Sequence, residues 1–137
     1  MVPINCFAVV VAAIVNMVLG SLWYGPIFGK QWMTLMGKDM NNMSKDGMGK
    51  KYVIAGIGSL LIAFVLAHSI IFATTYLHIG GISAAFQAAF WNWLGFIAPV
   101  TVGMVLWEGK SWKLWMILNG YYLLSLFLMS SILMYWA

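Results

Sequence analysis

Four apolar runs, each long enough to cross a membrane, dominate this sequence of 137 residues. A transmembrane helix needs about 20 consecutive, mostly apolar residues. Runs of this kind extend over about 4–23, 52–77, 82–107 and 112–136. Hydrophobic residues make up 64% of the chain and charged residues only 7%, whereas a soluble domain carries about 25% charged residues. The sequence therefore predicts an all-α, polytopic membrane protein, with four transmembrane helices in a single domain over 1–137.

The charged residues indicate how these helices are oriented. All seven basic residues are lysines that lie in the break between the first and second runs, in the break between the third and fourth, or at the second residue of the fourth run: Lys30, Lys38, Lys45, Lys50, Lys51, Lys110 and Lys113. With four crossings, these two breaks share one side, which the positive-inside rule makes cytoplasmic. We expect a multi-pass protein of the bacterial cytoplasmic (inner) membrane with both termini extracytoplasmic. The lysines that give the chain its net charge of +4 therefore orient it in the lipid bilayer, and no nucleic-acid partner is expected.

A short amphipathic segment follows the first run. Apolar side chains recur at helical spacing at Phe28, Trp32, Leu35 and Met36. A helix with one apolar face lies well in the membrane interface. We therefore expect a short cytoplasmic interfacial helix after the first transmembrane helix.

Polar side chains within the apolar runs are the candidates for function. The amides are Asn16, Gln87, Asn92 and Asn119, and the ionisable group is His68. One interpretation is that they hydrogen-bond between helices, as such residues often do in membranes. The other is a polar pathway formed by Asn16, His68, Asn92 and Asn119. In both interpretations His68 is expected to face the protein interior, because an ionisable ring against lipid is costly.

Small residues indicate how the helices pack. The second run has a small side chain at every fourth position, at Ala55, Ser59, Ala63 and Ala67, which lets another helix approach closely. Pro99 lacks a backbone N–H and predicts a kink within the third run. Trp91 and Trp93 lie too deep for an interfacial aromatic belt, so we expect them to pack between helices.

Sequence signatures of catalysis or of metal binding are not found. Cys6 is the only cysteine and Glu108 the only glutamate, and no phosphate loop, nucleophile elbow or metalloprotease motif is present. We predict no catalytic, cofactor-binding or metal-binding residues, and we leave any cofactor unknown. An enzymatic function is disfavoured but not excluded.

Two stretches carry a resemblance to a known family. The first contains Trp23, Tyr24, Pro26, Gly29, Lys30 and Trp32, and the second contains Asn119, Gly120 and Tyr121. Both resemble domain of unknown function family 1761, a family of small bacterial membrane proteins with four helices. The resemblance implies the same four-span layout along almost the whole chain, and it implies no activity.

Three classes of function remain open. The first is a non-enzymatic protein that forms a homo-oligomer, either as a small channel or transporter or as a structural membrane module. The second is an accessory subunit of another membrane protein. The third is a small membrane enzyme acting on a lipophilic substrate, with His68 and Tyr121 or Tyr122 as acid–base groups.

Overall fold

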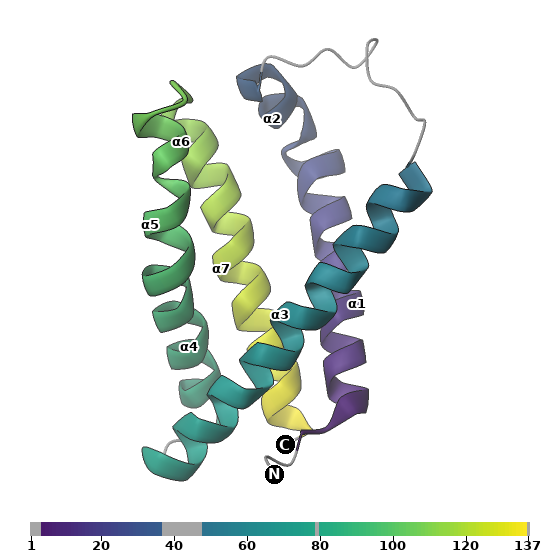
Figure 1. The fold of residues 1–137 in the computed structure, drawn as a ribbon, viewed down its shortest axis with the longest axis vertical. Coiled ribbons are helices and arrows are strands. Elements are labelled where there is room, and N and C mark those ends of the chain that lie inside the picture. The colour runs from purple at the N-terminus through teal and green to yellow at the C-terminus, as the bar shows by residue number, and fades with distance from the viewer. Residues whose placement is uncertain (1–3, 37–47, 79, 137) are drawn as a thin grey trace.

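Four helices of membrane-spanning length make up the fold (Figure 1). A computed structural model describes residues 4–36, 48–78 and 80–136. The spans are Cys6–Ile27, Gly49–Tyr76, Gly81–Leu106 and Trp112–Tyr135, and each is apolar enough to cross a bilayer. The predicted four-span fold is therefore confirmed, with boundaries within four residues of those expected from hydropathy.

The first span is an α-helix that ends in a wider, π-helical turn containing a proline. α1 (Cys6–Leu22) begins at Asn5, whose side-chain oxygen accepts hydrogen bonds from the backbone N–H groups of Phe7 and Ala8. It continues into a π-helical segment, η1 (Trp23–Ile27), which contains Pro26. The following α2 (Gly29–Met36) confirms the predicted short helix. The adjoining polar loop, with Lys38 and Lys45, lies outside the described residues.

The second span is one long helix and the third is interrupted. α3 (Met48–Tyr76) crosses without a break. The third span comprises α4 (Gly81–Asn92), the π-helical η3 (Trp93–Ile97), α5 (Ala98–Thr101) and α6 (Gly103–Leu106). Pro99 stands at the start of α5, where it cannot donate to the carbonyl of Gly95. The third span is thus irregular from Trp93 onward, and the kink expected at Pro99 stays a prediction.

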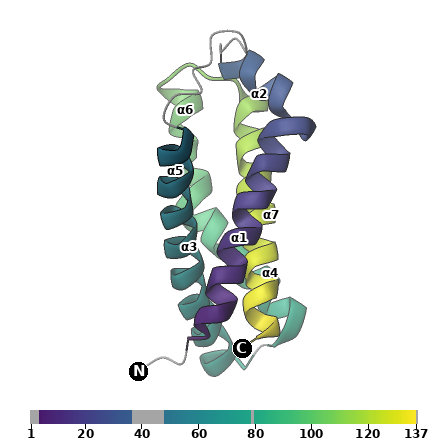
Figure 2. The same ribbon diagram turned by 90° about the vertical axis from the view of Figure 1, so that its right-hand side faces the viewer.

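The last helix, α7 (Trp112–Tyr135), lies at the centre of the bundle. It packs against α1 on one side and α4 on the other, while α3 runs obliquely across the bundle and packs mainly on α1 (Figures 1 and 2). Small side chains fill much of the core, because they let the backbones approach closely. The core residues include Ala8, Ala12, Ala63, Ala67, Ala88, Ala89, Ile70, Leu126, Met129 and Leu133.

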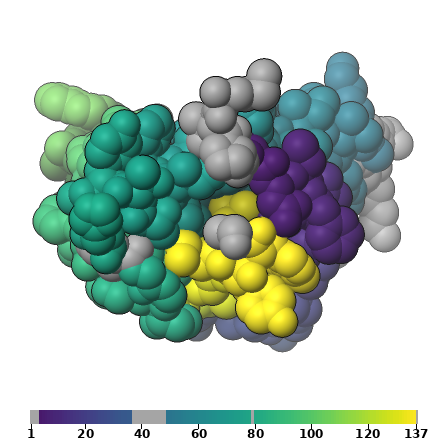
Figure 3. Space-filling model, turned by 90° about the horizontal axis from the view of Figure 1, so that it is seen from below, coloured from purple at the N-terminus to yellow at the C-terminus, as the bar shows by residue number. Residues whose placement is uncertain are grey.

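The two ends of the bundle differ in charge. One end carries the described parts next to both termini and the connection between α3 and α4 (Figure 1). Seen from this end, the last turns of α7 lie between the start of α1 and the region where α3 and α4 meet (Figure 3). The opposite end carries α2, the start of α3 and the connection from α6 to α7. The described lysines belong to this second end: Lys30, Lys50, Lys51, Lys110 and Lys113.

Candidate functional site

A buried polar cluster ties three spans together around Asn16. The Asn16 amide nitrogen donates to the Ser59 hydroxyl of α3 over 2.8 Å. Its side-chain oxygen accepts from the Tyr121 hydroxyl of α7 over 2.8 Å and also from the Ser125 hydroxyl of the same helix. Asn16, Ser59 and Ser125 are all buried. In lipid, such bonds satisfy polar groups that hydrocarbon cannot satisfy, so the cluster fixes how α1, α3 and α7 pack.

A second polar cluster surrounds Asn119 on α7, which is 3% exposed. Its side-chain oxygen accepts from the indole N–H of Trp93 over 2.9 Å. Its amide nitrogen donates to the Thr101 hydroxyl over 3.1 Å and to the Trp115 carbonyl over 3.0 Å. Asn119 therefore joins α7 to the irregular part of the third span.

The two π-helical segments contact α7 in similar ways. Each begins with a tryptophan whose indole N–H donates to α7: Trp23 to the carbonyl of Ile117 over 3.0 Å, and Trp93 to Asn119. Because α7 lies between these segments, the two indoles hold it from both sides within one helical turn. π-Helical turns of this kind are frequent at functional sites.

The two family-like stretches meet at the lysine-bearing end. The ring of Tyr24 lies 5.4 Å from that of Trp32 and 5.3 Å from that of Tyr121, measured between ring centroids. A Cβ at Gly120 would lie 3.2 Å from the Trp23 ring. Together these residues form an aromatic junction between η1, α2 and α7.

Two glycines, Gly20 and Gly29, leave room for close contacts beside this junction. Two other residues of the family-like stretch, Pro26 and Lys30, are not part of it. A Cβ at Gly29 would lie 2.8 Å from the Tyr24 carbonyl oxygen, and one at Gly20 would lie 3.0 Å from the Tyr121 hydroxyl. Pro26 and Lys30 are exposed. The aromatic junction therefore depends on close backbone approach, while Lys30 is free to face the membrane surface.

His68 and Asn92 are placed differently from Asn16 and Asn119. The Nδ1 of His68 lies 2.9 Å from the carbonyl oxygen of Phe64, in its own helix. The amide of Asn92 donates to the Ala88 carbonyl of its own helix over 2.7 Å. Within the described residues, the four candidates do not form one hydrogen-bonded path: Asn16 and Asn119 anchor separate clusters, and His68 and Asn92 bond locally.

The small-residue ladder of α3 is partly used within the chain. Ser59, Ala63 and Ala67 are buried, and Ala63 is fully covered. Ala55, one turn before Ser59, is exposed. Pro99 is also exposed, so its role within the chain is limited to shaping the helix.

Which of these residues pair with one another was not predicted from the sequence. Tyr121 and Ser125 stand four residues apart, a spacing that places them on one face of α7. That spacing was a usable signal, but it does not reveal which helix they face. Thr101 and Trp93 come together with Asn119 only because the third span is irregular. Within the described residues, no group of three His, Cys, Asp or Glu side chains is placed to hold a metal ion.

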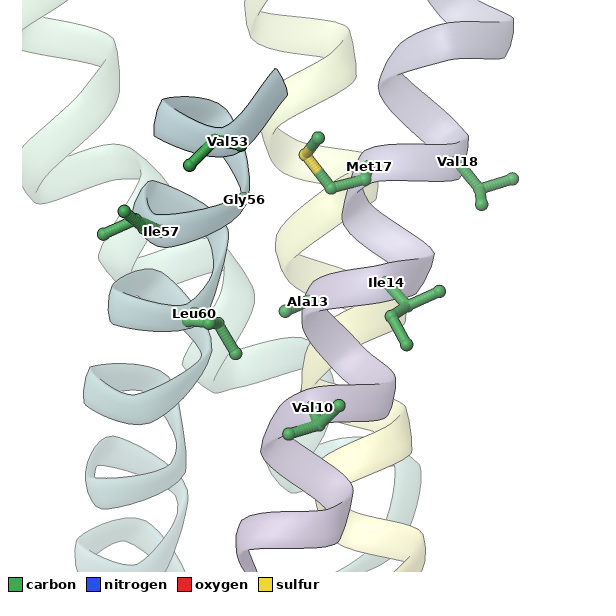
Figure 4. Close-up of a pocket in the computed structure, with 9 residues that line it drawn as sticks. All are labelled: Val10, Ala13, Ile14, Met17, Val18, Val53, Gly56, Ile57 and Leu60. Atoms are coloured by element: carbon green, nitrogen blue, oxygen red, sulfur yellow. The ribbon is translucent and has the colours of Figure 1, made fainter. Parts of the chain in front are cut away.

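An apolar groove lies between α1 and α3 (Figure 4). Its volume is about 420 Å³, and its lining comes from the two helices: Val10, Ala13, Ile14, Met17, Val18, Val53, Gly56, Ile57 and Leu60. The lining offers hydrocarbon and no polar side chain, so lipid tails are suited to fill it.

These features define a four-helix membrane protein in which two polar clusters and an aromatic junction hold a central helix. Residues 7–134 match the family described as protein of unknown function (DUF1761), and the chain belongs to this family. This match confirms the resemblance seen in the two short stretches. No curated protein and no solved structure matches the chain.

Proposed function

We propose that this protein is a homo-oligomeric structural module of the bacterial cytoplasmic membrane. The observation that carries the proposal is the closure of its buried polar clusters. The amides of Asn16 and Asn119 each engage partners from neighbouring helices of the same chain. Polar groups used in this way stabilise a fixed bundle, and these two amides are not free to line a path for ions or solutes.

The same contacts disfavour acid–base chemistry at Tyr121. Its hydroxyl donates to Asn16, with the side-chain oxygen at 2.8 Å and the backbone carbonyl at 3.2 Å. A general acid or base must reach the proton of a substrate. A hydroxyl committed to a neighbouring helix is better suited to packing than to catalysis.

The orientation is part of this proposal. The lysine-bearing end, which includes Lys30, Lys50 and Lys110, would face the cytoplasm under the positive-inside rule. The termini and the α3–α4 connection would then be extracytoplasmic. α2 would lie at the inner interface with its lysine toward the headgroups.

Incomplete coverage of the third span supports the oligomer. Only 6% of the residues in its most apolar window are buried within the chain, against 39% in the fourth span. The third span is therefore the one least covered by the rest of the chain and most open to lipid or to a neighbouring protein.

Flux measurements test the structural assignment. We expect vesicles containing the purified full-length protein to leak protons and potassium no faster than protein-free vesicles of the same lipid. The oligomeric state is measured in parallel, by sedimentation in a density-matched detergent. Ion or solute flux that rises with protein content would overturn the structural assignment, and a monomer at all concentrations would overturn the homo-oligomer.

A further inference from the structure

Two polar side chains of α4 are at least partly exposed at membrane depth. Gln87 and Trp91 stand four residues apart, hence on one face of the helix. At 1.5 Å per residue they lie about 9 Å and about 15 Å from the start of α4, the second being close to mid-membrane. Trp91 is 62% exposed and Gln87 half-buried. Neither side chain hydrogen-bonds to any residue that the structure describes.

Lipid tails cannot satisfy these groups. The Gln87 amide offers two N–H donors and an acceptor oxygen, and the Trp91 indole offers one donor. A polar group without a partner is costly in hydrocarbon. Tryptophan facing lipid normally sits at the membrane interface, where its N–H meets water or headgroups. Trp93, two residues on, shows the alternative, since its indole N–H is bonded to Asn119.

The next position along this face leaves room for a close approach. Gly95 follows Trp91 by four residues, and a Cβ placed there would meet nothing within 4 Å. Small residues on a helix surface let the backbone of a second helix approach closely, so that the side chains of the two helices come into contact. Gln87, Trp91 and Gly95 therefore combine unpaired polar groups with a site of close contact; we call them the α4 face.

The groove between α1 and α3, unlike the α4 face, has no unpaired polar side chain in its lining. Its lining side chains are apolar, so lipid tails can fill it without leaving a polar group unpaired. A partner protein is required by the α4 face and not by the groove.

We infer that the α4 face binds the α4 face of a second copy of this chain. The inference rests on the homo-oligomeric state proposed above and identifies its surface. An amide is self-complementary, because it both donates and accepts. Across a two-fold axis each Gln87 donates to the oxygen of its counterpart, which gives two equivalent bonds. The remaining amide N–H and the Trp91 indole N–H are brought close to the partner's polar groups.

Dimer dissociation constants of the full-length protein, measured by energy transfer between labelled copies in one detergent, test this contact. We expect Gln87→Leu to raise the constant about tenfold, as the loss of two interhelical hydrogen bonds implies. Asn92→Leu is the matched control, because Asn92 is an amide of the same helix already bonded to the Ala88 carbonyl. Asn92→Leu should change the dissociation constant by less than about twofold. The loss of an interhelical hydrogen bond would change it by more.

A second pair of variants tests the close approach. Gly95→Leu should weaken the dimer, whereas Gly58→Leu on α3 should not, although a Cβ at either position meets nothing within 4 Å in the chain. Circular dichroism and melting temperature establish that all four variants are folded.

Each result has a defined meaning. Loss of association in both α4-face variants, with both controls intact, supports the inference. A wild-type dimer that persists in Gln87→Leu and Gly95→Leu overturns the inference and leaves the proposed homo-oligomer standing. A wild-type monomer overturns both. A stable complex with a different membrane protein, again lost in Gln87→Leu, would overturn the choice of a second copy as the partner.

Discussion

The indole N–H of Trp93 donates a hydrogen bond to the side-chain oxygen of Asn119 over 2.9 Å. The two residues are 26 positions apart in the sequence, and their bond joins the third span to α7. Trp23 donates to α7 at Ile117, two residues away, from the opposite helix. Each tryptophan begins a π-helical segment. The two irregular segments therefore share a role, which is to present an indole to the central helix.

Removing the acceptor of Trp93 should destabilise the bundle. Asn119→Leu leaves the part-buried Trp93 indole N–H without its acceptor, while the Thr101 hydroxyl keeps its bond to the Ile97 carbonyl. Leaving a desolvated donor unpaired costs about 1–3 kcal/mol. We expect a lower melting temperature in a fixed detergent. Asn92→Leu, which removes a bond only within α4, should lower it much less, and equal losses would show that the contact to Trp93 contributes little.

The spans were predictable from the sequence because hydropathy is a local property. The span Trp112–Tyr135, for example, is recognised from its own length and hydropathy, without knowledge of the helices that it contacts. The partners of Asn16 were not predictable, since Ser59 and Ser125 are 43 and 109 residues away and the sequence does not fix how the helices are rotated. Pro99 indicated a disturbance of the third span, but nothing in the sequence indicated that the π-helical segment begins at Trp93.

Glycine positions provide a graded test of the aromatic junction. A Cβ at Gly29 would meet the Tyr24 backbone oxygen at 2.8 Å, and one at Gly120 would meet the Trp23 ring at 3.2 Å. Overpacking of this kind costs about 1–3 kcal/mol. Because backbone atoms move less readily than a ring, we expect Gly29→Ala to lower the stability more than Gly120→Ala. Gly58→Ala, with open space around its Cβ, is the control. Three equal melting temperatures would contradict close packing here.

Added volume should also be poorly tolerated on the buried face of α3. Ala63 is fully buried, whereas its neighbour Ile62 is 46% exposed. We expect Ala63→Leu to cost about 1–3 kcal/mol of stability, and Ile62→Leu to cost less, because that exchange adds no volume and the position is exposed. Thermal unfolding of both variants in one detergent measures the difference. If the two variants unfold at the same temperature, the ladder of small residues does not limit packing.

The proposed orientation is tested by labelling single cysteines in a Cys6→Ser background. Ser83→Cys lies near the end that carries the termini, and Ser111→Cys lies between α6 and α7 at the lysine-bearing end. We expect a membrane-impermeant maleimide to label the first in intact cells and the second only after the membrane is opened. The reverse pattern would invert the topology without changing the fold.

The last prediction concerns His68, whose ring is held by its own helix. The Phe64 carbonyl can only accept a hydrogen bond, so this contact requires a proton on Nδ1. The Phe64 ring packs edge-on against the imidazole at 4.6 Å between centroids. A side chain anchored in this way is suited to a local structural role. We therefore expect His68→Gln to retain the melting temperature and the oligomeric state, because an amide can donate to the same carbonyl. Both are measured in one detergent at pH 5.5 and pH 7.5. Loss of the oligomer in His68→Gln at either pH, with the fold intact, would show that His68 acts on a partner outside its own helix.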